Sequence, residues 1–255
     1  MKVSTLTSVF LIVAASLISN QLHAQSCLTN RIDKYAKVVK VFDGDTVKLA
    51  SGEKVRFIGI NAPEMNYKTK NPEPYAREAM EFVTSKILNQ RVGLRYGAEH
   101  NDNYGRVLAH IFLEDGSNLQ AMLLQQGLAI NIAIPPNIWQ QKCYQSLETS
   151  ARKKQQGLWK NKYFQPLDAK KINQSTTGFH HVTGVVNSIS ITDKSLWLNL
   201  TSQMSLRISK KDMTLFDRLD VKQLQGKQVI AKGWINYQNK RFSMRLKHPS
   251  SLEIL

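Results

Sequence analysis

The sequence lacks several features that mark whole classes of protein. Beyond its first residues it has no long apolar run, and only two cysteines occur among its 255 residues. We therefore expect no membrane span in the mature chain and no scaffold dense in disulfides. Acidic residues are scarce, with 19 Asp and Glu against 35 Lys and Arg. Low-complexity tracts are also missing, which predicts a globular protein of one large or two ordinary domains.

The first residues form a pattern of their own. Residues 1–24 have an early lysine, an apolar run over 9–18 and a small residue, Ala24, at their end. That pattern is typical of a secretory signal peptide, because the run is short for a bilayer span and no stop-transfer charges follow it. We expect cleavage near Ala24 and a secreted or periplasmic protein, with a retained membrane anchor as the alternative.

The charge balance indicates the kind of partner. Removal of residues 1–24 takes away one lysine and no acid, which leaves 34 basic and 19 acidic residues and a net charge of +15. An excess of this size favours polyanionic partners, nucleic acid first and anionic membrane second.

The two cysteines, Cys27 and Cys143, allow two interpretations. An even number of cysteines in an oxidising compartment favours one disulfide, which would join the N-terminal tail to the body of the protein. Alternatively, Cys143 shares an apolar helix face with Trp139, Leu147 and Ala151, where a free cysteine would belong to the core.

The first half of the chain reads as strands followed by helices. Alternating or β-branched runs predict five strands, and turn residues separate them. A helix is expected after residues 71–74, a second between the capping box at Ser117 and Gly127, and a third between Asn137 and Gly157. This order fits a small closed barrel of the OB type, with helices interposed and appended. The predicted strands are 36–42, 45–50, 54–60, 90–96 and 106–113.

The second half is separated from the first by polar and small residues. We expect a linker over 166–179 between a domain at 36–165 and a smaller one at 180–255. Five short β-like runs with one helical stretch, 210–219, predict a second, OB-like β domain, so that the fold class is α+β. The predicted strands of this domain are 181–191, 196–200, 204–208, 228–237 and 241–246.

Residues 43–106 contain groups suited to phosphodiester hydrolysis. This reaction needs positive charge on the phosphoryl oxygens, an oriented water and a stabilised leaving oxygen. Asp45 follows a tight turn, Arg56 begins a run that ends at Glu64, and Arg106 ends a second turn. Each is a weak signal alone, since Asp-Gly-Asp is usually a hairpin turn and a strand arginine is usually solvated.

The order of these motifs resembles the staphylococcal nuclease family over residues 36–160. The resemblance implies a five-stranded OB barrel with three helices. It also implies that Asp45, Asn61 and Ala62 hold Ca²⁺, with Mg²⁺ or another divalent ion as the alternative. Arg56, Glu64 and Arg106 would be catalytic: the arginines bind phosphate, and Glu64 orients or deprotonates the attacking water. The matching stretches are 41–47, 55–64, 102–106, 119–129 and 157–159.

The chain departs from this family at two places. Asn61 stands where the family has a second metal-binding carboxylate, so calcium affinity is expected to fall. Residues 129–135, which align with a tyrosine-bearing nucleotide pocket, contain no aromatic side chain. Tyr104 matches another tyrosine of that pocket and is expected to keep part of the contact.

The resemblance implies a calcium-dependent endonuclease that cuts DNA and RNA to leave 3′-phosphate ends. With the signal-peptide pattern, we expect this enzyme to be exported, and we expect it to be a monomer. The alternative is a nucleic-acid-binding module without activity, in which Asn61 has weakened the metal site. A pure binding module has no evident need for Glu64.

The aromatic residues of the second half leave their role open. Trp197, Trp234, Tyr237 and Phe242 fall in predicted strands and are either barrel core or, if they face outward, platforms for stacked bases. Basic residues that would accompany such platforms are Arg207, Lys210, Lys211, Arg241 and Arg245.

Overall fold

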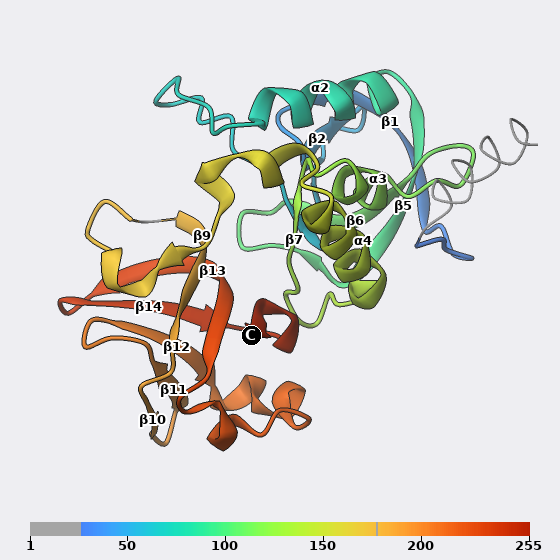
Figure 1. Ribbon diagram of the computed structural model, residues 1–255. Helices are drawn as coiled ribbons and strands as arrows, with labels where there is room; N and C mark the ends of the chain where they lie inside the picture. The colour runs from blue at the N-terminus through green and yellow to red at the C-terminus, as the bar shows by residue number, and fades with distance from the viewer. Residues whose placement is uncertain (1–26, 177) are drawn as a thin grey trace, which may run out of the picture.

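The computed structural model describes residues 27–176 and 178–255. The expected signal peptide and its cleavage point lie outside these residues. The chain forms two halves that lie side by side, a barrel with helices and a curled β-sheet (Figure 1). Within the described part of the chain, no helix has the length and apolar content needed to cross a bilayer.

The first half contains the closed barrel that the sequence predicts. Its strands follow one another in the order β1-β2-β3-β6-β5, and β1 pairs with β5 to close it. The β3–β6 pair is parallel and the other barrel pairs are antiparallel. A further pair of two-residue strands, β4 and β7, was not predicted. The bounds are β1 Lys34–Val41, β2 Thr46–Leu49, β3 Lys54–Phe57, β4 Ile60–Asn61, β5 Arg91–Asn101, β6 Val107–Phe112 and β7 Ile130–Asn131.

Three helices pack on this barrel: α2 (Ala76–Ile87), α3 (Leu119–Gln125) and α4 (Gln141–Lys153). All three were predicted, but two caps were wrong. Asn118, not Ser117, caps α3, because its side chain accepts a hydrogen bond from Ala121 N. Asn137 does not cap α4, since its side chain instead bonds the backbone N–H and C=O of Glu99.

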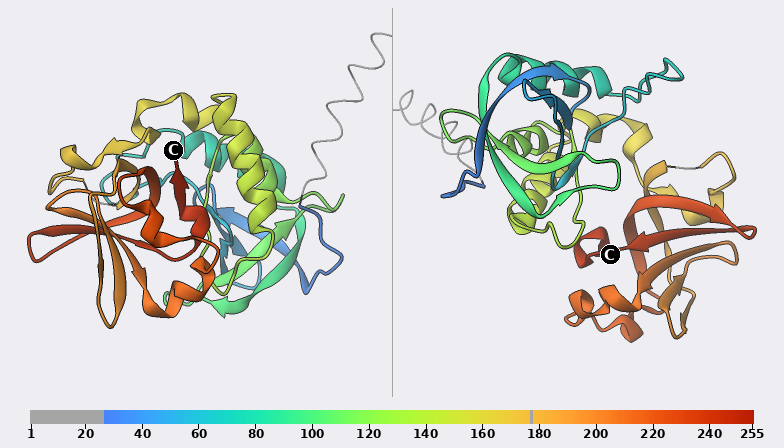
Figure 2. Two further views of the ribbon diagram at one scale, coloured as in Figure 1. Left: turned by 60° about the horizontal axis from the view of Figure 1, so that its bottom comes forward. Right: turned by 180° about the vertical axis from the view of Figure 1, so that it is seen from behind.

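The second half is an open sheet that curls into a half-barrel (Figure 2). Its order is β10-β11-β12-β14-β13-β9-β8, and β15 pairs with β13. The predicted strand 181–191 is divided into β9 and β10, and the predicted helix 210–219 is the 3₁₀-helix η4. Part of the expected linker forms β8 and η3. The strands are β8 Leu167–Asp168, β9 Gly178–Val185, β10 Ser188–Ile191, β11 Ser195–Asn199, β12 Met204–Ser209, β13 Gln228–Gln238, β14 Arg241–Leu246 and β15 Leu252–Ile254, and the 3₁₀-helices are η1 Gly157–Lys160, η2 Lys162–Phe164, η3 Ala169–Lys171, η4 Lys210–Phe216, η5 Val221–Leu224 and η6 Pro249–Ser251.

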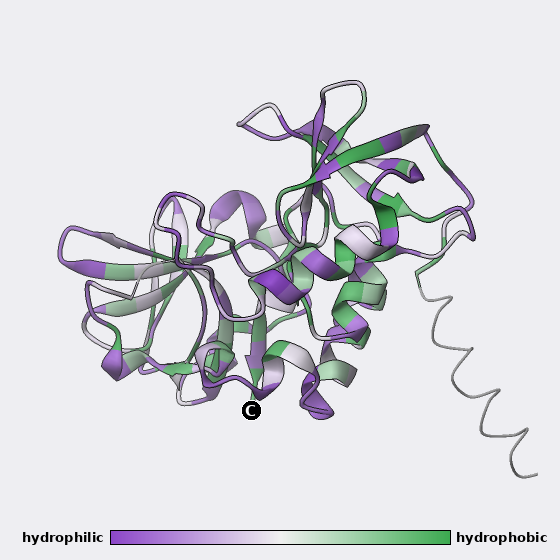
Figure 3. Cartoon of the chain, turned by 90° about the horizontal axis from the view of Figure 1, so that it is seen from above, coloured by the Kyte–Doolittle hydropathy of each residue, from purple (hydrophilic) through white to green (hydrophobic). Residues whose placement is uncertain are grey.

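Each half has its own apolar core, because strand residues alternate between buried and exposed positions (Figure 3). A third, smaller cluster that includes Trp159 and Phe164 lies where the halves meet, with Phe179 at its edge. Glu148 of α4 forms a buried ion pair with Lys232 of β13 across this contact. The interface is therefore both apolar and ionic.

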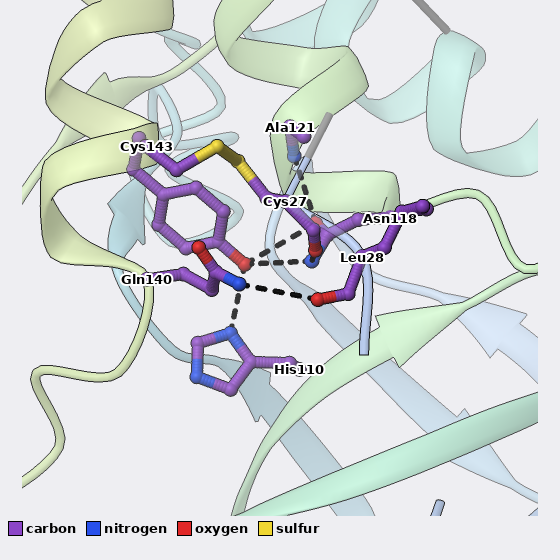
Figure 4. Close-up of a disulfide and its surroundings, with 8 residues drawn as sticks. Cys27, Leu28, His110, Asn118, Ala121, Gln140 and Cys143 are labelled. Carbon is purple, nitrogen blue, oxygen red and sulfur yellow. Dashed lines mark hydrogen bonds between the residues drawn. A yellow bond between two sulfur atoms is a disulfide. The ribbon is translucent and has the colours of Figure 1, made fainter. Parts of the chain in front are cut away.

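The two cysteines form the expected disulfide, Cys27–Cys143, which joins the N-terminal segment to α4 (Figure 4). Asn118 Nδ2 donates to the carbonyl of Cys27 at 3.2 Å, and Gln140 Nε2 donates to the carbonyl of Leu28 at 3.1 Å. The segment is thus fixed to the barrel by a covalent bond and by hydrogen bonds.

Candidate active site

Three of the predicted site residues meet at one end of the barrel. Asp45 precedes β2, Arg56 lies in β3, and the neighbouring Thr46 pairs with Arg56 across the two strands. Arg56 Nη1 lies 2.6 Å from Asp45 Oδ2, and Arg56 Nη2 donates to Asn61 Oδ1 at 3.1 Å. Asp45 is only 2% exposed, so this ion pair is largely shielded from water.

The backbone of the fourth residue, Ala62, completes this cluster. Ala62 N donates to Asp45 Oδ2 at 2.7 Å, and Thr46 Oγ1 donates to Asp45 Oδ1 at 3.1 Å. Both carboxylate oxygens of Asp45 are therefore held in place. The turn before Asp45 requires glycine at position 44, because a Cβ there would lie 2.6 Å from Ala62 Cβ and 2.7 Å from Ala79 Cβ of α2.

The structure adds a residue that the sequence analysis missed. Asp43 Oδ1 accepts a hydrogen bond from Asp45 N at 2.9 Å, which places a second carboxyl group beside Asp45. Burial, reinforced by repulsion from Asp45, raises the pKa of Asp43 to about 8. The spacing of two residues between the acids was the signal available in the sequence.

The oxygens in this cluster fit a hard divalent cation. Asp43 and Asp45 are neighbouring carboxyl groups, and Asn61 has an amide oxygen beside Arg56; the resemblance adds the carbonyl of Ala62, whose N–H bonds Asp45. Burial, followed by repulsion from Asp45, raises the pKa of Asp43, and a bound cation would favour the charged form of both acids. Among the described residues, however, no group of three or more His, Cys, Asp or Glu side chains is placed to hold a metal. A cation there would depend on Asn61 and the carbonyl as well as on acids.

Glu64 lies at the rim of the cluster, with its side chain open to solvent. Partial desolvation, followed by repulsion from Asp45, raises its pKa, while Arg56 and Arg106 act in the opposite direction. Its backbone is firmly held: Glu64 N donates to Glu73 Oε2 and Glu73 N donates to Glu64 O, both at 2.9 Å. Glu73 Oε1 also accepts a hydrogen bond from Tyr163 Oη at 3.0 Å.

Arg106 is placed by the turn between β5 and β6. Its Nε and Nη2 lie 2.8 and 2.7 Å from Asp102 Oδ2, and Gly105 takes the positive φ that the turn requires. Tyr104 is 85% exposed, and its ring lies 5.5 Å from the Arg106 guanidinium. Within the part of the chain that the structure describes, the side-chain partner of Arg106 is Asp102, outside the Asp45 cluster, but the charge of Arg106 acts on Glu64.

The segment that the resemblance aligns with the family's nucleotide pocket lies in the interior of this protein. Residues 129–133 are buried, and Asn131 uses its backbone and side chain to bond Glu148 and Gly59. No aromatic side chain of this segment is available for stacking. Tyr104 is the tyrosine of this chain that the resemblance assigns to that pocket.

The first half of the chain is similar in sequence to known proteins. The family described as "Staphylococcal nuclease homologue" matches residues 54–161. A thermonuclease of Staphylococcus intermedius is 36% identical over 125 residues, which cover 48% of this chain and 74% of that protein. The chain belongs to the staphylococcal nuclease family.

Other members of the staphylococcal nuclease family match a similar share of the chain. A thermonuclease of Staphylococcus hyicus is 32% identical over 138 residues, or 52% of this chain and 80% of the relative. "Endonuclease YhcR" of Bacillus subtilis (strain 168) is 30% identical over 134 residues, which are 48% of this chain and 11% of that much longer protein. The chain is thus a nuclease of this family whose barrel carries an additional C-terminal β region.

Proposed function

We propose that this nuclease is an exported, calcium-dependent endonuclease that hydrolyses DNA and RNA as a monomer and leaves 3′-phosphate ends. The observation that carries the proposal is the buried cluster of Asp45, Arg56 and Asn61, with Glu64 and Arg106 at its rim. The proposed division of the chain is a nuclease domain at 36–165, a linker at 166–179 and a second domain at 180–255.

The proposed chemistry assigns each residue one task. Asp45, Asn61 and the carbonyl of Ala62 would hold Ca²⁺, which supplies Lewis-acid polarisation of the phosphate when bound. Arg56 and Arg106 stay charged at any working pH and would bind the phosphoryl oxygens, on which negative charge grows during attack. Glu64 would take a proton from the attacking water as the new P–O bond forms. The P–O5′ bond then breaks, and the 5′ oxygen takes up a proton from solvent.

A specific observation favours a second candidate, a binding module without activity. The oxygen of Asn61 already accepts a hydrogen bond from Arg56, and an amide binds calcium less strongly than a carboxylate. In that module the arginines would still bind phosphate. The position of Glu64 beside the cluster supports the enzyme instead.

Cleavage of single-stranded DNA by the mature protein tests the proposal, with calcium, with magnesium and with chelator. We expect turnover with calcium and none with chelator. Glu64→Gln and Arg106→Ala should each reduce kcat by about a hundredfold or more while the fold is kept, because each removes a group that acts in the transition state.

The matched controls are Glu78→Gln and Arg77→Ala, which change exposed residues of α2 in the same way. Both should cleave at the parental rate. Parental turnover in Glu64→Gln would refute the assigned mechanism. Binding of DNA without cleavage under every ion would support the binding module.

A further inference from the structure

The outer face of the second sheet carries polar residues in register. Strands β10, β11, β12 and β14 align so that apolar cross-strand rows alternate with rows that are mainly polar or charged. One row is apolar and buried, as expected for alternating strands. That row contains Leu198, Leu206 and Met244.

The outward rows are of a different kind. One contains Ser190, Trp197, Arg207 and Arg245, and the next contains Ser188, Asn199, Ser205 and Ser243. Hydrogen bonds connect the second row: Asn199 Nδ2 donates to Ser188 Oγ at 3.1 Å, and Ser205 Oγ donates to Asn199 Oδ1 at 2.8 Å. We refer to these two rows, together with Arg241, as the polar face.

The polar face is hollowed. A cavity of about 640 Å³ lies over it and extends to the β13–β14 hairpin, where Gln238, Asn239 and Arg241 contribute to the lining. Among the described residues that line this cavity, none is acidic. A hollow of this volume can take a ligand of the size of a nucleotide, and amide and hydroxyl groups supply both donors and acceptors.

The cations of the polar face differ in how they are compensated. Arg245 is paired with Asp212, at 2.7 Å between Nη2 and Oδ2. Arg207 lies with its guanidinium 5.4 Å from the centre of the Trp197 ring, and its Nε donates to the hydroxyl of Ser195 at 2.8 Å. Within residues 27–176 and 178–255, neither Arg207 nor Arg241 forms an ion pair with a carboxylate.

These features together point to one ligand. The partly exposed indole of Trp197 offers a base a stacking surface, and the guanidinium of Arg241, which lines the cavity and has no carboxylate partner among the described residues, suits a phosphate. A neutral saccharide would use the hydroxyls but would gain little from Arg241. The choice of nucleic acid over another polyanion rests on the proposed nuclease function.

We propose that the polar face binds single-stranded nucleic acid, as a second contact for the strand that the barrel cuts. The loop that follows Glu64 and the β13–β14 hairpin extend to the same side of the molecule, the left in Figure 1 and the right in the view from behind in Figure 2. We therefore place the strand along this side, where it would contact both sites. The polar face then contributes affinity for long substrates and does not act on the scissile bond.

The test measures binding of the full mature chain to fluorescent oligothymidylate of about 20 nucleotides, longer than the roughly 4–16 nucleotides that one OB-type site covers. Chelator is present, so that no strand is cut. Trp197→Ala and Arg241→Ala should each weaken binding by about tenfold, and Arg241→Ala should lower the salt dependence by about one phosphate contact. Turnover of a dinucleotide substrate, which is too short to span the two sites, should stay at the parental value.

The matched controls are Trp234→Ala and Arg218→Ala, an exposed tryptophan and an exposed arginine outside the polar face. Both should bind at nearly the parental affinity. Parental affinity in Trp197→Ala and Arg241→Ala would overturn the proposal, and so would an equal loss in the controls. If Trp197→Ala does not fold, Arg241→Ala and Arg241→Glu carry the test.

Two further outcomes separate the possibilities. If a neutral maltooligosaccharide protected Trp197 from fluorescence quenching and oligothymidylate did not, the proposal would be overturned in favour of a saccharide site. Absence of any cleavage by the parental chain would refute the nuclease mechanism alone, because the binding measurement does not depend on turnover.

Discussion

Asn61 is the residue at which the proposed metal site departs from the family pattern. Its amide oxygen lies near the buried Asp45, and Arg56 contacts both. Exchange of the amide for a carboxylate would add one unit of negative charge to an all-oxygen site. That change bears directly on calcium affinity, which rises with the number of charged ligands.

Asn61→Asp is therefore expected to tighten calcium binding by on the order of tenfold. Isothermal titration calorimetry with calcium measures the dissociation constant, and Asn30→Asp, at an exposed position, is the control for net charge. An unchanged constant in Asn61→Asp would show that this side chain is not a ligand.

The loop between Glu64 and Glu73 is the element that positions the proposed catalytic carboxylate, Glu64. Reciprocal hydrogen bonds between these two residues close its base, and Tyr163 of η2 holds the Glu73 side chain. Burial, with help from Glu73, raises the pKa of Tyr163 to about 12, so the phenol keeps its proton and remains a donor over the working range.

Tyr163→Phe should lower kcat by about 2- to 10-fold with little change in KM, since a hydrogen bond to a charged acceptor contributes about 1.5–3 kcal/mol and only part of it is felt at Glu64. Steady-state kinetics provide the test. Tyr35→Phe, an exposed tyrosine of β1, should leave both constants unchanged. Equal rates in the two variants would mean that Tyr163 does not position the loop.

The segments that follow α3 and α4 meet at two glycines, Gly127 and Gly157. Gly157 has a φ of +56°, and a Cβ there would lie 2.2 Å from the carbonyl oxygen of Gly127. Leu158 N also donates to that oxygen at 2.8 Å, so the backbones touch directly.

Gly157→Ala should destabilise the fold by more than about 1 kcal/mol, because it adds steric overlap to an unfavourable φ. Urea unfolding measures the difference. Gly116→Ala separates the two causes, since Gly116 also has a positive φ but nothing lies within 4 Å of its added Cβ. A loss no larger in Gly157→Ala than in Gly116→Ala would contradict the overlap argument.

Local patterns were sufficient to predict the barrel strands and the stop at Gly127, because both depend on neighbours in sequence. The stop expected at Gly157 was wrong, since α4 ends at Lys153 and Gln155, with a φ of +50°, takes the left-handed position after it. Caps were harder: Asn137 has the residue type of an N-cap, but the nearby strand backbone at Glu99 uses its side chain. Asp43 was missed for a similar reason. Its altered protonation arises from burial and from Asp45, and burial by distant segments is not visible in a local motif.

The interface between the halves contains a buried histidine that has to stay neutral. His181 of β9 packs against Trp159, at 5.6 Å between ring centres, and faces Glu148 and Arg152 of α4 and Lys232 of β13. Burial, with the nearby Lys232 and Arg152, lowers its pKa from 6.5 to about 3. His110 in the barrel, beside Tyr144, is lowered to about 3 by burial as well.

Both histidines predict a loss of stability in acid. Between about pH 6.5 and pH 3 these histidines bind protons in the unfolded chain but not in the folded chain. The free energy of unfolding therefore decreases as the pH falls. Each contributes up to about 1.4 kcal/mol per pH unit within that window. Urea midpoints at several pH values measure the slope.

Substitution of either histidine tests its share of that slope. His181→Gln or His110→Gln should make the slope smaller, whereas His100→Gln, at an exposed position, should not change it. A slope that is the same in all three variants would assign the acid sensitivity to other groups.

The disulfide closes a covalent ring of the chain whose limits differ from those of the two halves of the fold. Cys27 and Cys143 are 116 positions apart in sequence, and the segment between them includes the whole barrel and the loop after Glu64, while the second sheet lies outside the ring. A protease that nicks the chain anywhere inside this ring leaves two fragments covalently joined, with every catalytic candidate retained. A cut after Cys143 instead frees the C-terminal fragment from any covalent tie. The bond thus keeps the barrel strands covalently joined after a single backbone break within the ring, whereas a cut after Cys143 leaves the second half held by its interface alone.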